Sequence, residues 1–208
     1  MEFKTKKQAL EVVKGLSKPS KMPCYGYSLP AAACGVGSKL RKVKGSVCSN
    51  CYAHKGMYRF SIVQQALQRR LIAIRDPNWS DAMIYLIKDM PYFRFHDSGD
   101  IQDEKHLETI FDVTEGCRNT KFWLPTREHQ IVKKLLKKRS KPKNLIIRLS
   151  ALMLEQDGPK KLARDLGVQI STVKSENYSC PAHEQNNECK DCRKCWDGRN
   201  FNISYRLH

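Results

Sequence analysis

The chain has 208 residues, nine of them cysteine, and a formal net charge of +17 at pH 7. Its length is sufficient to bury a core, so the cysteines are not needed to staple a very small fold. No stretch of about 18 uncharged apolar residues occurs and the N-terminus lacks an apolar signal region, which argues against a membrane partner and predicts a soluble, cytoplasmic protein with reduced cysteines.

Apolar residues at helical spacing predict three helices in the first half of the chain, near 3–16, 63–74 and 83–90. Between the first two lies a stretch, 17–56, that is rich in Gly, Pro, Ser, Lys and Cys and shows little periodicity. We expect this stretch to be a long loop. Because it has no apolar face to order it, a bound metal centre is the expected source of order.

Beyond Pro91 the pattern alternates between strand and helix, which is typical of a parallel sheet with crossover helices. The expected strands are 92–96, 121–124, 145–149 and 168–173, and the expected helices lie around 107–111, 131–136 and 162–166. The chain is too short to contain the eight such units that would close a (β/α) barrel. We therefore predict an α/β fold, either a partial (β/α) barrel or a small parallel sheet. The expected division is an α/β domain at 1–178 and a cysteine-rich segment at 179–208.

Four cysteines near the C-terminus have the spacing C-x8-C-x2-C-x2-C, and a proline follows the first. Two consecutive C-x2-C steps bring three thiolates onto one tight loop, which suits a cubane iron–sulfur cluster. Zinc is the alternative, although zinc sites more often use two separated pairs. Four ligands close the cluster, so a structural or electron-transfer role is expected. These ligands are Cys180, Cys189, Cys192 and Cys195.

A second set begins with the pair Cys48 and Cys51, with Cys34 and Cys24 upstream on the same loop. Together with Cys34, four runs resemble the phage gene product 88 family: VCSNCYAHKGMY at 47–58, FRFHDSGD at 93–100, FWLPTR at 122–127 and the closing CxxCxxCW. That family is distantly similar to radical-SAM proteins. The resemblance implies an iron–sulfur protein, located in the host cytoplasm if phage-encoded, with radical chemistry as a candidate activity.

In radical-SAM proteins three loop cysteines hold a [4Fe-4S] cluster whose fourth iron binds S-adenosylmethionine. Their usual loop is C-x3-C-x2-C, whereas here 13 residues separate Cys34 from Cys48. If Cys24 also binds, the cluster is closed and takes no cosubstrate; if it does not, an open iron remains. One cluster or two are thus expected, and Cys117 is interpreted as a small buried hydrophobe.

Polar residues at the carboxyl ends of the strands are candidates for ligand binding. By resemblance, Asp97, Ser98, Gly99 and Asp100 occupy the place of a radical-SAM motif that grips the amino group of the cosubstrate. An ordinary strand-to-helix turn has the same composition. Arg127 follows the next strand and is a candidate anchor for a carboxylate or phosphate.

Seven positive charges at 133–143 form a candidate phosphate-binding stripe or a plain solvated face. Residues 159–178 also resemble a helix-turn-helix, although the alternation in VQISTV favours a strand. Two function classes follow. One is a redox or radical enzyme that needs an electron donor and acts on a small anionic ligand. The other is a non-catalytic iron–sulfur or zinc protein whose basic surface binds nucleic acid or a protein partner.

Overall fold

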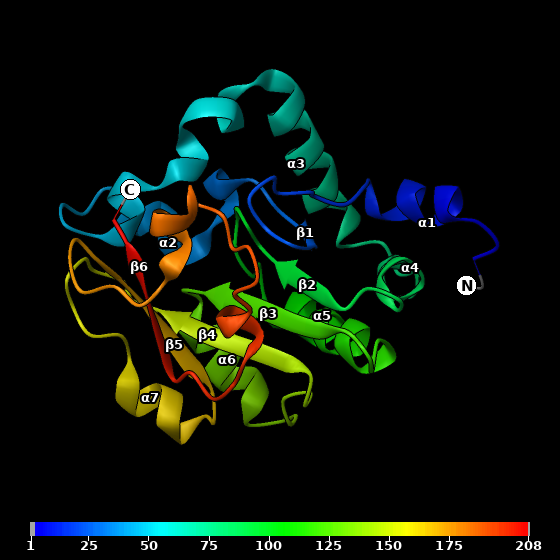
Figure 1. Ribbon diagram of the computed structural model, residues 1–208. Helices are drawn as coiled ribbons and strands as arrows, with labels where there is room; N and C mark the ends of the chain where they lie inside the picture. Colours follow the sequence, from blue (N-terminus) through cyan, green and yellow to red (C-terminus); the bar gives the residue numbers. More distant parts are fainter. Residues whose placement is uncertain (1–2, 208) are drawn as a thin grey trace.

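The computed structural model describes residues 3–207, which form an α/β fold around one six-stranded, all-parallel sheet (Figure 1). The order of the strands across the sheet is their order along the chain. A (β/α) barrel has this sequential order, and here the sheet stays open, with β1 and β6 at its two edges. The strands are β1 (Tyr25–Tyr27), β2 (Tyr92–Phe95), β3 (Lys121–Thr126), β4 (Leu145–Ser150), β5 (Gln169–Lys174) and β6 (Asn202–Arg206).

Helices cover one face of the sheet and enclose the main hydrophobic core. In β2, Phe93 and Phe95 alternate with Tyr92 and Arg94, so the two phenylalanines point together into this core while the other two side chains lie on the opposite face. Ring contacts extend the core into β3, where Phe122 packs against Phe95. The α-helices are α1 (Lys6–Val13), α2 (Gly35–Leu40), α3 (Ser61–Ala73), α4 (Trp79–Ile87), α5 (Glu104–Gly116), α6 (His129–Leu136) and α7 (Lys160–Asp165).

The four strands expected from the sequence are confirmed as β2 to β5, with bounds that shift by one to two residues. The two edge strands were not expected, because β1 has three residues and β6 follows the cysteine-rich segment. The helix-turn-helix reading of 159–178 is wrong. Its would-be recognition helix is β5, which pairs with β4 on one side and β6 on the other.

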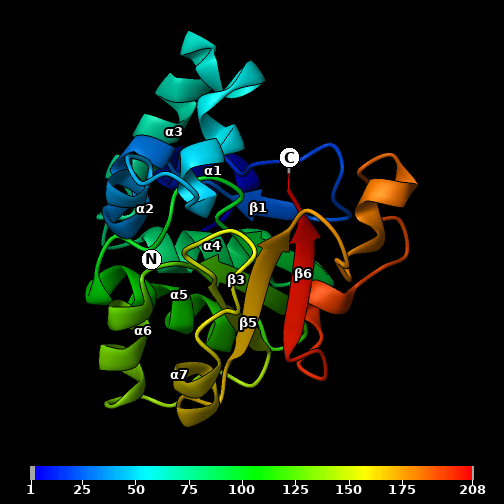
Figure 2. The ribbon, with the colours of Figure 1, turned by 90° about the vertical axis from the view of Figure 1, so that its left-hand side faces the viewer.

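The opposite face of the sheet is covered by an irregular segment of the chain rather than by α-helices. Between β5 and β6, the segment 175–201 contains only two 3-10 turns, Pro181–Gln185 and Lys194–Trp196. It lies across the sheet from α6 and α7 (orange in Figure 2). Trp196 is buried there against Trp123, with ring centroids 5.3 Å apart, and its indole Nε1 donates to the Phe93 carbonyl at 2.9 Å. The C-terminal segment thus forms a second, smaller core and then supplies β6.

The stretch 17–56 contains β1, α2 and short 3-10 turns and is otherwise irregular. After it, α3 stands away from the body of the molecule (Figure 1) and buries only Leu67 and Ala73. Arg70 anchors this helix through hydrogen bonds to the Gly15 and Leu16 carbonyls. In the part of the chain that the structure describes, no helix has the length and apolar character needed to cross a membrane.

Candidate functional site

Three cysteines of the N-terminal loop converge beyond the carboxyl end of β1. Cys34 precedes α2, Cys48 lies within the 3-10 turn Val47–Asn50, and Cys51 directly follows this turn. A Cβ built on Gly37 would lie 3.5 Å from the Cys48 sulfur and 3.6 Å from the Cys34 sulfur. The two sulfurs therefore face the same point, which glycine leaves clear.

Backbone hydrogen bonds fix this loop to the carboxyl end of the sheet. The Val47 N–H donates to the Leu152 carbonyl at 3.0 Å, and the Leu154 N–H donates to the Gly45 carbonyl at 2.9 Å. Since 152–154 directly follow β4, the cysteine loop is tied to the carboxyl end of the sheet. Ligands of parallel α/β folds bind at this end.

A buried glutamate from the loop after β3 orients the start of α2. Glu128 is 7% exposed, and its Oε1 accepts a hydrogen bond of 2.7 Å from the Val36 N–H. A carboxylate at the first turn of a helix satisfies a free N–H group and interacts favourably with the helix dipole. Because α2 starts immediately after Cys34, this contact also sets the position of Cys34.

The pKa values of the Cys34 and Cys48 thiols are changed by burial and by charged neighbours. Burial raises the pKa of the Cys34 thiol, and the nearby Asp100 carboxylate raises it further. Cys48 and Cys51 act in the same direction, whereas the Arg127 guanidinium lowers it. Burial likewise raises the pKa of Cys48, and Arg127 again opposes it. Arg127 is thus the cation that stabilises the ionised form of Cys34 and Cys48.

The tetrapeptide 97–100 lies beside this group, and its side chains already bond within the protein. Ser98 Oγ donates to the Leu29 carbonyl at 2.8 Å. Asp100 accepts hydrogen bonds from Thr126 Oγ1 at 2.6 Å and from the Arg127 N–H at 2.9 Å. Burial raises the pKa of Asp100 to about 6, although these hydrogen bonds lower it. Asp100 therefore ties the loop after β2 to the loop after β3.

Gly99 has a structural reason to be glycine. Its φ is +78°, and an added Cβ would lie 2.5 Å from the Cβ of Leu29. Any other residue would be strained and would also collide with the segment that leads into the cysteine loop.

Asp97 is the acceptor of a polar cluster that links the cysteine loop to the other face of the sheet. The hydroxyls of Tyr52 and Tyr58 both donate to it, and Arg94 Nη1 lies 2.9 Å from its Oδ1. The Arg94 guanidinium stacks over the Trp123 ring, 4.3 Å from the centroid. These contacts tie Tyr52, which follows Cys51, to the small core beneath the C-terminal segment.

The C-terminal cysteines gather in this small core, and Cys24 lies with them. The Cys195 side chain packs beside Cys24, Trp123 and Trp196. The Cys189 thiol contributes to a raised pKa of Cys24, and the Cys189 N–H donates to the Lys21 carbonyl at 3.0 Å. Burial, the larger effect, raises the pKa of Cys24 to about 12. The structure therefore places Cys24 apart from Cys34, Cys48 and Cys51.

Arg148 on β4 fixes the end of the C-terminal cysteine segment. It is 0% exposed, and its guanidinium donates to five backbone carbonyls. Burial lowers its pKa, and Cys195 is one of the groups that oppose this change. Among residues 3–207 no carboxylate forms an ion pair with Arg148, so a buried positive charge lies beside these thiols. The five carbonyls belong to Ile170, Lys194, Cys195, Asp197 and Asn200.

Sequence reasoning missed Glu128, Arg94 and Arg148. A usable signal for the arginines was present, because each stands inside an otherwise apolar or aromatic strand, in YFRF and LIIRLS. A charge at such a position has to meet partners on a buried face. Glu128 gave no comparable signal, since its partner Val36 is 92 residues away.

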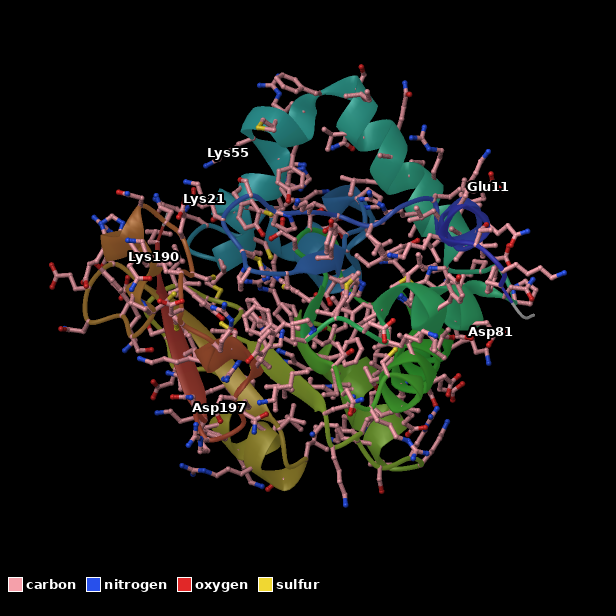
Figure 3. The ribbon with its side chains drawn as sticks, turned by 45° about the vertical axis from the view of Figure 1, so that its right-hand side comes forward. Glu11, Lys21, Lys55, Asp81, Lys190 and Asp197 are labelled. Atoms are coloured by element: carbon pink, nitrogen blue, oxygen red, sulfur yellow. The ribbon has the colours of Figure 1, made fainter. Side chains whose placement is uncertain are left out.

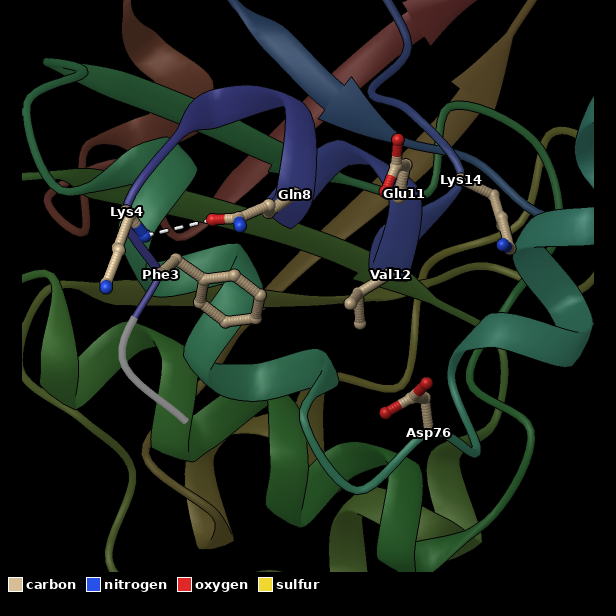
Figure 4. Close-up of a pocket in the computed structure, with 7 residues that line it drawn as sticks. All are labelled: Phe3, Lys4, Gln8, Glu11, Val12, Lys14 and Asp76. Atoms are coloured by element: carbon tan, nitrogen blue, oxygen red, sulfur yellow. Dashed lines mark hydrogen bonds between the residues drawn. The ribbon is translucent and has the colours of Figure 1, made fainter.

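Cys117 and a pocket beside α1 lie outside both cysteine groups. Cys117 is 1% exposed within the main core, as expected for a small buried hydrophobe. A pocket of about 460 Å³ between α1 and Asp76 is lined by Phe3, Val12 and charged side chains and has no cysteine (Figure 4). It offers no group that connects it to the chemistry of the cysteine loops.

Across the described range, no three His, Cys, Asp or Glu side chains are close enough to hold a single metal ion. A polynuclear cluster is wider than one ion and separates its thiolates further. A zinc site and a cubane therefore require different spacings of the same thiols.

The basic run at 133–143 is partly neutralised by α5. Lys138 pairs with Glu104, and Arg139 pairs with Asp112 and Glu115. Lys141 donates to the Leu145 carbonyl at 2.7 Å. Fewer than half of its seven positive charges thus pair with carboxylates. The net positive charge of this surface is nevertheless lower than the sequence predicts.

The family model described as Gene product 88 matches residues 2–198. The matched range includes both cysteine groups and the tetrapeptide 97–100. Neither the curated proteins nor the solved structures contain a match to the chain.

Proposed function

The chain belongs to the gene product 88 family, and we propose that it is an iron–sulfur protein whose Cys34, Cys48 and Cys51 hold a [4Fe-4S] cluster. The observation that carries this proposal is the convergence of the Cys34 and Cys48 sulfurs on the space beside Gly37, at the ligand-binding end of a parallel sheet. Arg127 adds a positive charge where three thiolates would accumulate negative charge.

The position of Cys24 decides which form of the cluster we propose. Because Cys24 lies with Cys189 and Cys195, the N-terminal group has three cysteines and leaves one iron without a protein ligand. When bound, such a cluster supplies one-electron chemistry to a cosubstrate, and S-adenosylmethionine is the candidate by resemblance to radical-SAM proteins. A likeness of the open, sequentially ordered sheet to a radical-SAM partial barrel is part of this proposal.

The roles of the chain's own residues follow from their contacts. Glu128 positions Cys34 through α2, and Asp100 holds together the two loops that border the thiols. Arg127 keeps its guanidinium beside Cys34 and Cys48, and its buried Nε has no hydrogen-bond partner among the described residues. Arg127 is therefore the proposed anchor for an anionic group of the cosubstrate.

We propose a second [4Fe-4S] cluster on Cys180, Cys189, Cys192 and Cys195, in a structural or electron-transfer role. The support is the buried Arg148 charge beside Cys195 and the shielding of this core by Trp196. A thiolate cluster carries net negative charge, so an unpaired buried cation favours its binding. Removing the cluster would leave Arg148 with carbonyl partners alone.

The activity test is reductive cleavage of S-adenosylmethionine by anaerobically prepared protein with dithionite as the electron source. Cleavage that is lost in Cys51→Ala and kept in Cys117→Ala supports the proposal, since both variants remove one cysteine. Two intact clusters without any cleavage would instead favour the second function, a non-catalytic iron–sulfur protein. The observation behind that alternative is that Asp97, Ser98 and Asp100 are already engaged within the protein.

A further inference from the structure

Positive charge is concentrated in the part of the chain that carries Cys34, Cys48 and Cys51. Residues 12–75 contain twelve Lys and Arg and no Asp or Glu, although the whole chain has 38 and 21. In Figure 3 the labelled Lys55 and Lys21 lie on one side of the molecule, and the acidic Glu11 and Asp81 lie on the opposite side. The cysteine loop thus lies in a long basic stretch of the chain that contains no acidic residue.

Six of these cations flank the cysteine loop, and all six are exposed. None of them takes part in an ion pair within residues 3–207, in contrast to Lys138 and Arg139, which follow α6. We refer to them as the cysteine-loop cations: Lys39, Arg41, Lys42, Lys44, Lys55 and Arg59.

Exposed apolar side chains continue this surface. Met57 is 72% exposed and Phe60 is 59% exposed, and both adjoin Arg59. Cations that follow a phosphate backbone, together with a free aromatic ring on which a base stacks, are the two components of single-strand binding surfaces. An acidic protein partner would pair with the cations but would leave Phe60 without a specific role.

The depth of the thiols also favours a single strand over a duplex. Cys48 is 7% exposed, and Cys34 and Cys51 are half-buried, so the thiols lie below the surface that carries the cations. A base stacked inside a duplex does not reach a recessed centre, whereas a single strand can insert one.

We propose that the cysteine-loop cations and Phe60 bind single-stranded nucleic acid, which is the substrate class of the N-terminal centre. The binding surface itself depends only on the positions of these side chains, whereas the assignment as substrate rests on the function proposed above. Each cation neutralises a phosphate, and the recessed thiols lie beside the bound strand.

The test is fluorescence anisotropy of a labelled 20-nucleotide single strand with the full-length, anaerobically prepared protein over a range of salt concentrations. Replacing Arg41, Lys42 and Lys44 by Gln is expected to weaken binding about tenfold and to lower the slope of log affinity against log salt by about 2, at about 0.7 for each phosphate contact. The matched control replaces the exposed Lys133 and Lys134 of α6 and Lys137, which directly follows this helix, by Gln. This control removes the same charge and is expected to change both quantities much less.

Phe60→Ala is expected to weaken binding by about fivefold or more without changing the salt slope, because stacking is not electrostatic. Equal losses in the two triple-Gln variants, or tighter binding of a duplex of the same length, would overturn the proposal. The iron content of the same wild-type preparation separates the two proposals. Wild type that lacks iron but binds the strand contradicts the cluster alone, and wild type that holds iron but shows no site-dependent binding contradicts the nucleic-acid surface alone.

Discussion

The Glu128 carboxylate accepts a 2.7 Å hydrogen bond from the Val36 N–H across 92 residues of sequence. It joins the loop after β3 to the first turn of α2, directly behind Cys34. The same oxygen would lie 3.0 Å from a Cβ at Gly35, so a larger residue there would crowd the carboxylate. The cysteine loop thus takes part of its position from a carboxylate in the loop after β3.

We predict that Glu128→Ala lowers the free energy of unfolding by about 1–2 kcal/mol, because a partly buried N–H loses its acceptor. It should also reduce the iron bound at the N-terminal group. Glu128→Gln keeps an oxygen acceptor and is expected to retain most of both. Urea unfolding and iron analysis of the two variants provide the measurement, and equal behaviour of Ala and Gln would show that the hydrogen bond does not position the loop.

Gly37→Ala tests the space between the two sulfurs. The added Cβ would be 3.0 Å from the Cβ of Cys34 and would project between the Cys34 and Cys48 sulfurs. Alanine favours a helix by about 1 kcal/mol over glycine, so the metal-free protein should keep its stability to within that amount. Its iron content should nevertheless fall by about half, because one of two cubanes is blocked. Ser38→Ala, at the next and exposed position of α2, is the control and should keep full iron. Full iron in Gly37→Ala would contradict the proposed cluster position.

Arg148 should not tolerate even lysine. Its planar guanidinium donates to five carbonyls, and a single ammonium cannot reproduce this arrangement. We expect Arg148→Lys to lower the free energy of unfolding by about 3 kcal/mol and to release the C-terminal segment to proteolysis. Arg199→Lys is the matched control, because Arg199 is 91% exposed and pairs only with Asp197. Protease resistance equal to wild type in Arg148→Lys would mean that other contacts hold the segment.

Because two histidines are buried, we predict that the free energy of unfolding falls in mild acid. Burial lowers the pKa of His106 from 6.5 to about 4 and lowers that of His96 well below 6.5. The folded state thus excludes protons that the unfolded state binds, so the stabilising contribution is complete above pH 6.5 and is lost as pH falls toward the folded pKa. The expected decrease is about 1.4 kcal/mol per pH unit for each histidine.

Urea unfolding of the metal-free protein between pH 6.5 and 5.5 measures this slope. His106→Gln should reduce it by about half, and His183→Gln, at an exposed position, should not change it. Identical slopes in all three proteins would show that His106 titrates normally in the folded state.

The sequence predicted the central strands because their apolar runs are bounded by clear turn signals. It did not predict β1 or β6, since a three-residue strand and a strand such as NISYR have too little apolar pattern to be recognised. Their position in the sheet depends on pairing with distant strands, for example Tyr25 beside Phe93. Local periodicity has no information about such pairing.

Proximity along the chain left open whether Cys24 joins Cys34, Cys48 and Cys51. Cys24 precedes Cys34 by ten residues, but β1 lies between them. A strand carries the chain from the amino end of the sheet toward its carboxyl end. The other candidate cysteines of each set lie on one segment of the chain, and their role as cluster ligands stays a prediction. Short spacing constrains a loop, whereas a strand between two cysteines separates them.

Iron and sulfide analysis of anaerobically prepared protein tests the central claim most directly. The account predicts about eight irons and eight inorganic sulfides per chain, and about four of each after Cys34, Cys48 and Cys51 are replaced by Ala. It also predicts that Cys24→Ser keeps the N-terminal four. A colourless protein that contains no iron and is still folded would contradict it.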